Sequence, residues 1–105
     1  MTTPVHSVTA LSLVTLESQP PKLAIHVVGK TGTPNWTGFA LAHRVYVTPP
    51  ADGVYEADVV GVPPSGMVIE VVTPFAFSEI WGHIPTDLKG FRVYSATDSV
   101  TTMLA

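Results

Sequence analysis

Hydrophobic and polar residues alternate along several short stretches of the chain. The clearest stretch is 22–28, in which Leu23, Ile25 and Val27 share one face while Lys22 falls on the other. A period of two residues is typical of a β-strand with one buried face. Similar patterns predict six further strands, at residues 5–16, 40–48, 54–60, 67–72, 91–98 and 100–104.

Two stretches depart from simple alternation. Segment 5–16 carries apolar residues on both faces, which suits either a strand buried on two sides or one that changes sheets at a kink. In segment 73–90 the alternation breaks down. Ser78 is placed to cap a helical turn through Gly82, and Thr86 to cap another turn before Gly90.

Seven predicted strands, separated by turns rich in proline and glycine, favour an all-β chain that forms a single β-sandwich domain over residues 1–105. The stretch 84–94 resembles the approach to strand F in fibronectin type III and related immunoglobulin-like domains. There, an apolar residue, a proline and a glycine precede an aromatic residue and an alternating strand. The resemblance implies an immunoglobulin/fibronectin III-like sandwich. It departs at Phe91, where the family's corner tyrosine carries a hydroxyl, and the strand-C tryptophan is missing.

The alternation also predicts which side chains form the core. The inward positions on four of the predicted strands are Ile25, Val27, Val45, Val47, Ile69, Val71, Phe91 and Val93. If this register is right, truncating a core residue such as Ile69 to alanine costs about 2–5 kcal/mol of stability.

Composition narrows the range of functions. The chain has five lysines and arginines and a net charge of −3, which disfavours binding to nucleic acid or to an anionic membrane. No apolar run is long enough to span a bilayer. Residues 1–6 lack the pattern of a signal peptide, and the chain has no cysteine; both features favour the cytoplasm.

Candidate chemistry is sparse. No two of the four histidines have the close spacing of a local metal site, and no motif of a nucleophilic enzyme is present, so we expect no metal, no cofactor and no catalytic residue. Glu56 and Asp58 share a strand face, where paired carboxylates can serve acid–base chemistry or bind calcium. The alternation itself predicts a solvated outer face at this point. Arg44 and Tyr46 are placed to pair with these carboxylates or with Glu70 across strands.

The aromatic residues of the predicted loops are the remaining signal. They either pack as lids over the ends of the sandwich or stay exposed for a partner. Only 12% of the residues are charged, and several apolar side chains fall opposite the predicted core. We therefore expect a non-catalytic interaction or structural module that self-associates as a homo-oligomer or binds a protein partner. The interface candidates are Trp36, Phe39, Tyr46, Val72, Phe75, Phe77, Trp81 and Tyr94.

Two alternatives remain open. One is a small-ligand-binding protein or hydrolase-like enzyme with a site in the 75–83 loop, built from Glu79, Trp81 and His83. Glu79 and His83 would face one another if this loop were helical. The other alternative is a subunit of a larger viral or bacterial assembly, which suits the low charge.

Overall fold

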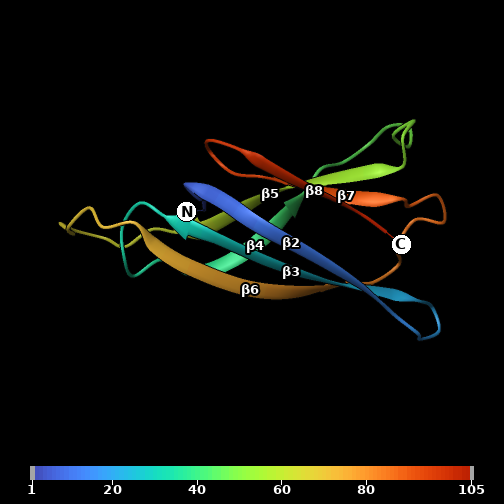
Figure 1. The fold of residues 1–105 in the computed structure, drawn as a ribbon, viewed down its shortest axis with the longest axis horizontal. Helices are drawn as coiled ribbons and strands as arrows, with labels where there is room; N and C mark the ends of the chain where they lie inside the picture. Colours follow the sequence, from blue (N-terminus) through green and yellow to red (C-terminus); the bar gives the residue numbers. More distant parts are fainter. Residues whose placement is uncertain (1, 105) are drawn as a thin grey trace.

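The computed structural model describes residues 2–104, which form eight β-strands in two sheets and no helix (Figure 1). The chain is therefore all-β, as predicted. Accordingly, this part of the chain offers no helix long and apolar enough to cross a membrane. The strands are β1 (Thr3–Pro4), β2 (Ser7–Leu16), β3 (Lys22–Thr31), β4 (Thr37–His43), β5 (Val54–Val62), β6 (Thr73–Trp81), β7 (Gly90–Tyr94) and β8 (Ser99–Met103).

The two sheets differ in size and pairing. The smaller is an antiparallel sheet in the order β2-β3-β6, seen in Figure 1 as the blue, teal and gold strands. In the five-stranded sheet, β5 pairs with β4 along one edge and with β1 and β7 along the other, and β8 follows β7. The β5–β7 pair is parallel, from Val54 opposite Gly90 to Asp58 opposite Tyr94.

The N-terminal segment changes sheets, which confirms one of the two interpretations of its pattern. β1 pairs with β5 of the larger sheet, and β2 pairs with β3 of the smaller one. Between them, the buried Val5 donates its N–H to the Val59 carbonyl at 3.0 Å. A β-bulge between Val8 and Ala10 then shifts the alternation, so that Val8 and Leu11 are both buried. The bulge and the sheet change together explain why apolar residues occupy both faces of 5–16.

The core lies between β3 on one side and β5 and β7 on the other. The alternation of β3 is confirmed, because its inward residues are fully buried. Half of the core predicted from the sequence is therefore right: Ile25, Val27, Phe91 and Val93 have no exposed surface.

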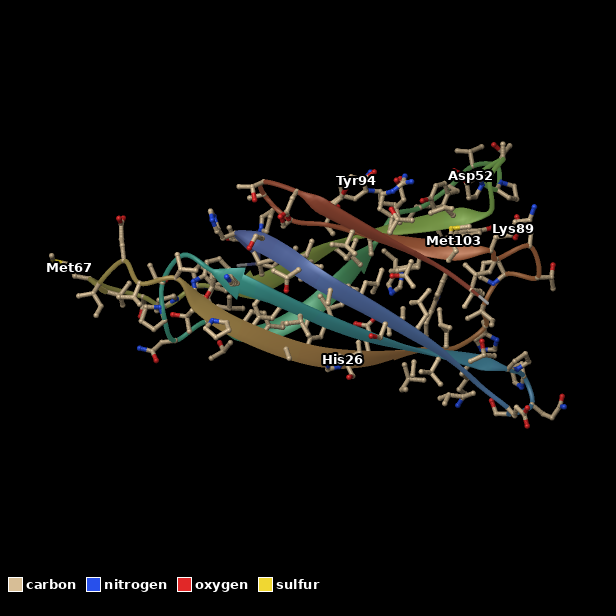
Figure 2. The ribbon with its side chains drawn as sticks, viewed as in Figure 1. His26, Asp52, Met67, Lys89, Tyr94 and Met103 are labelled. Carbon is tan, nitrogen blue, oxygen red and sulfur yellow. The ribbon has the colours of Figure 1, made fainter. Side chains whose placement is uncertain are left out.

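The other half of the predicted core is wrong. Val45, Val47, Ile69 and Val71 expose 97%, 103%, 72% and 49% of their surface. The strand predicted over 40–48 ends at His43, and segment 67–72 is not a strand. Residues 63–72, here called the arm, connect β5 to β6 and project from one end of the molecule, where Figure 2 labels Met67. The basis for a costly Ile69→Ala substitution is thereby removed.

The helical turns expected within 73–90 are also wrong. Residues 73–81 form β6, which pairs with β3 along its whole length, from Thr73 opposite Thr31 to Trp81 opposite Leu23. Exposed and half-buried residues alternate strictly along β6, as strand geometry requires. Three of the half-buried residues are aromatic: Phe75, Phe77 and Trp81. Pairing with a central strand overrides the local capping signal of Ser78. After β6, the segment before Gly90 forms only a turn, closed by a hydrogen bond from the Leu88 N–H to the Pro85 carbonyl at 3.2 Å.

Candidate functional site

An aromatic cluster closes the seam where β4 of one sheet meets β6 of the other. Phe39 on β4 stacks on Phe75 of β6, with ring centroids 4.4 Å apart and planes 4° apart, and lies 6.0 Å from Phe77. Trp36 precedes β4 and donates its indole N–H to the Thr33 hydroxyl at 2.9 Å. All four aromatic residues are half-buried against the core. The structure thus unites two groups of interface candidates that the sequence placed in separate loops.

A histidine–glutamate pair lies at the other end of this seam. His43 Nε2 lies 2.9 Å from Glu79 Oε2, and Glu79 Oε1 accepts the backbone N–H of Leu41 at 3.3 Å. The His43 ring packs 5.0 Å from Trp81 and 5.7 Å from Phe91. About a third of each side chain remains exposed, 30% for His43 and 31% for Glu79. The pair links the edges of the two sheets by side-chain hydrogen bonds where backbone pairing is absent.

The ligand site expected from Glu79, Trp81 and His83 is only partly assembled. Glu79 and Trp81 do share a face, but they do so as alternate residues of β6 and not as part of a helix. His83 lies beyond the end of β6, exposed and with a φ of 54°, so the expected pairing with Glu79 is wrong. The partner of Glu79 is His43. The only sequence signal for His43 was its place on the same face as Leu41 in the strand predicted over 40–48.

A polar cluster occupies the outer face of the larger sheet, around the Tyr94 label in Figure 2. Glu56 accepts hydrogen bonds from Arg92 at 2.9 Å, Tyr94 at 2.5 Å and Arg44 at 3.3 Å. Arg44 also binds Asp58 at 3.1 Å, and its guanidinium lies 4.2 Å above the Tyr94 ring. The expected pairing of Arg44 with both carboxylates is confirmed. Among residues 2–104, no group of three or more histidine, aspartate or glutamate side chains is arranged to hold a metal ion.

Hydrogen bonding shifts the ionisation of this cluster. The Tyr94 hydroxyl and the Arg92 guanidinium hold the pKa of Glu56 below its ordinary value of 4.5, against the opposing effect of burial. Hydrogen bonds from the same cluster raise the pKa of Arg92. Nearby, Tyr46 packs edge-on against Tyr55 at 5.3 Å, and burial raises the pKa of its hydroxyl. Glu56 is therefore charged and already paired at neutral pH.

This pKa shift predicts a specific acid sensitivity. A depressed pKa means that Glu56 stabilises the fold above pH 4.5 and loses that contribution as the pH falls through the lower folded value. Glu56→Gln should lower the free energy of unfolding by about 1–2 kcal/mol at pH 7. It should also flatten the loss of stability on acidification, as measured by urea unfolding at neutral and acidic pH. Glu70→Gln, on the exposed arm, is the matched control; a Glu56→Gln profile parallel to it would contradict the assignment.

The interface candidates divide among three places. Trp36, Phe39, Phe75, Phe77 and Trp81 line the seam between the sheets, Tyr46 and Tyr94 belong to the outer polar face, and Val72 lies in the arm. These candidates therefore do not form one continuous surface. The most exposed large apolar side chains, Val45, Val47, Met67 and Ile69, were missed as interface residues. The alternation assigned Val45, Val47 and Ile69 to the core, and Met67 was assigned to neither set.

A surface hollow lies away from these residues, at the turn between β2 and β3. It is lined by Glu17, Ser18, Gln19 and Pro21. None of the candidate residues contributes to this hollow.

Comparison with known protein families, with curated proteins and with solved structures finds no match to this chain. Any function must therefore be inferred from the geometry of the chain itself.

Proposed function

We propose that this protein is a non-catalytic interaction or structural module that associates with further copies of itself. One observation carries the proposal. Large apolar side chains that an isolated soluble domain would be expected to bury stand almost fully in solvent, with Val45, Val47 and Met67 exposed by 97%, 103% and 102%. They gather in two short segments, around residues 45–47 and 67–72, and exposed apolar groups that gather in this way mark interaction sites. The chain has only 13 charged residues to keep such a surface hydrated.

The polar clusters support this proposal in a second way. Glu79 is occupied by His43 and by the Leu41 N–H, and Glu56 is occupied by two arginines and a tyrosine. Groups with these partners hold strands together, and they do not line the hollow at the turn between β2 and β3. Their arrangement therefore favours a structural role over acid–base chemistry.

We further propose that the two sheets form a variant of the immunoglobulin/fibronectin III-like sandwich. A three-stranded sheet packs on a larger one across a shared core, and β7 follows the stretch that resembles the approach to strand F. The parallel β5–β7 pair would be a departure from that all-antiparallel family. The cytoplasm is the compartment we propose, since the chain has no cysteine to oxidise.

Sedimentation equilibrium over a wide range of protein concentrations tests the self-association. The weight-average mass should rise above that of the monomer between low and high micromolar concentrations, because covering apolar surface stabilises the associated state. A monomer mass throughout this range would overturn the proposal. It would instead favour the ligand-binding alternative, with His43 beside Glu79 and Trp81 in place of His83.

A further inference from the structure

We infer that the copies join head to tail, with the arm of one copy added as a β-strand to the open edge of residues 44–48 in the next. This inference rests on the proposed self-association and specifies its interface. Residues 44–48 are here called the edge segment. Residues 67–72 of the arm and the edge segment are both predicted as strand from the sequence, and both lie outside the two sheets.

The arm has the properties of a strand that lacks a partner. Residues 67–72 read Met-Val-Ile-Glu-Val-Val, with four β-branched residues, one charge and no proline. Such a composition favours extended pairing with another chain. Within residues 2–104, the only backbone hydrogen bond of the arm runs from the Val71 N–H to the Ile69 carbonyl, at 3.1 Å. The Val71 carbonyl also accepts the Thr73 hydroxyl at 2.8 Å. The other backbone groups of the arm make no hydrogen bond within residues 2–104 and are open to a strand from outside.

The edge segment continues β4 and leaves one side open. The Arg44 N–H donates to the Glu56 carbonyl at 3.0 Å, so the backbone of Arg44 faces β5. In an antiparallel pair the next residue points its N–H and C=O the other way, so those of Val45 face away from β5. Earlier on the same open edge, the Leu41 N–H is already taken by Glu79. The accessible part of this edge therefore begins beyond His43.

The edge segment also lacks a cover on one face. The alternation places Val45 on the same face as His43, which packs against Trp81, the last residue of β6. Because the smaller sheet ends at Trp81, nothing covers Val45 or Val47. An added strand with valine and isoleucine side chains would supply the missing apolar contacts.

Geometry requires that the two segments come from different copies. The molecule is 45 Å long, and the arm lies at one end, while the edge segment leads towards the opposite end, where Figure 2 labels Asp52. The arm has ten residues tethered at both ends by β5 and β6, so it reaches at most ~17 Å from its base. A surface that binds a different surface of the next copy produces rings or open chains.

Pairing of the arm with the edge segment is favoured over pairing of two arms. Two arms alone would make a two-stranded ribbon, which is marginally stable in water, and would leave Val45 and Val47 exposed. Addition to the edge segment extends a sheet of five strands instead. The charges of the two segments are also opposite in sign: Glu70 is the only charged residue of the arm, and Arg44, which also binds Glu56 and Asp58, is the only one of the edge segment.

A mixing experiment tests the arrangement. Ile69→Lys disables the arm and Val45→Lys disables the edge segment, at side chains exposed by 72% and 97%, so both variants should fold like the wild type. Each variant alone should be monomeric where the wild type associates. Mixed in equal amounts, they should form a one-to-one dimer and nothing larger. The intact arm of the Val45→Lys chain would pair with the intact edge segment of the Ile69→Lys chain, and no further intact pair would remain. Val14→Lys, at a site on β2 exposed by 57%, should associate like the wild type.

Each other outcome has a distinct meaning. If Val45→Lys still dimerises alone while Ile69→Lys does not, the arms pair with each other and the head-to-tail arrangement is wrong. If both variants associate like the wild type, the interface is wrong although self-association stands. A monomeric wild type overturns the proposed function itself. Folding of every variant is checked by its thermal unfolding transition.

Disulfide trapping gives an independent measurement, since the chain has no cysteine of its own. Ile69→Cys and Val45→Cys chains in equal amounts, one carrying a size tag, should form mixed dimers in clear excess over the two homodimers combined under mild oxidation. Val14→Cys in place of Val45→Cys should abolish that excess. Equal amounts of mixed dimers and homodimers would overturn the proposed contact.

Discussion

Replacing Ile25 with alanine should lower the free energy of unfolding by about 2–5 kcal/mol, whereas the same replacement at Ile69 should leave it nearly unchanged. Ile25 is fully buried on the central strand β3, between β2 and β6, so truncation removes apolar contacts and leaves a cavity. Ile69 has 72% of its surface exposed, and its truncation opens no cavity. For a domain of this size the loss at Ile25 is a large fraction of a total stability of about 5–15 kcal/mol.

The two isoleucines form a matched pair, because the alternation predicts both as core. Urea unfolding at a concentration where the protein is monomeric measures both variants under the same conditions. A cost at Ile69 as large as that at Ile25 would show that the arm packs on the core, and would restore the strand predicted over 67–72.

Replacing Gly29 with alanine should be the most damaging single-methyl change, with a cost of about 3 kcal/mol, the upper end for overpacking. A Cβ atom at Gly29 would lie 2.3 Å from the Ser7 carbonyl oxygen and 2.8 Å from the Phe75 ring. Ser7 belongs to β2 and Phe75 to β6, the two strands that flank Gly29 on β3. The backbone oxygen cannot move aside without disturbing the pairing of β2 near its bulge.

Gly32 provides the control three residues away. No atom lies within 4 Å of a Cβ built there, and its backbone has no positive φ. Gly32→Ala should therefore be neutral or stabilise by up to about 1 kcal/mol, through restriction of the unfolded chain. Thermal unfolding of the two variants gives the comparison. If Gly29→Ala and Gly32→Ala unfold at the same temperature, the close approach of β2, β3 and β6 at Gly29 is wrong.

Period-two alternation predicted several elements well because it is a local property of the chain. β3, β5, β7 and β8 lie where alternating stretches predict strands, and the inward faces of β3 and β7 are buried. The double-faced pattern of 5–16 also carried information, since it anticipated the change of sheet. β6 was not predicted, because its closely spaced aromatic residues and the helix-capping signal at Ser78 favoured a helical turn over a strand.

The partners in the candidate site are separated too widely in sequence for local patterns to join them. His43 and Glu79 are 36 residues apart, and only the packing of β4 against β6 brings them to 2.9 Å. Glu56 lies 38 residues from Tyr94, and it is the parallel pairing of β5 with β7 that places the hydroxyl on the carboxylate. The sequence identified Glu79 and Glu56 as notable and Arg44 as a partner for Glu56, but it did not identify the partners that are more distant along the chain: His43, Arg92 and Tyr94.

The sequence by itself determined most of the strands and which side chains share a face within them; the tertiary structure alone decided which of those faces are covered. Val27 and Val45 occupy equivalent inward positions of alternating stretches, yet Val27 is fully buried and Val45 is exposed by 97%. The difference is that β7 and β5 lie over Val27's side of the core, while β6 ends before it reaches Val45. Alternation follows from backbone geometry within one strand, whereas burial depends on where a second sheet begins and ends.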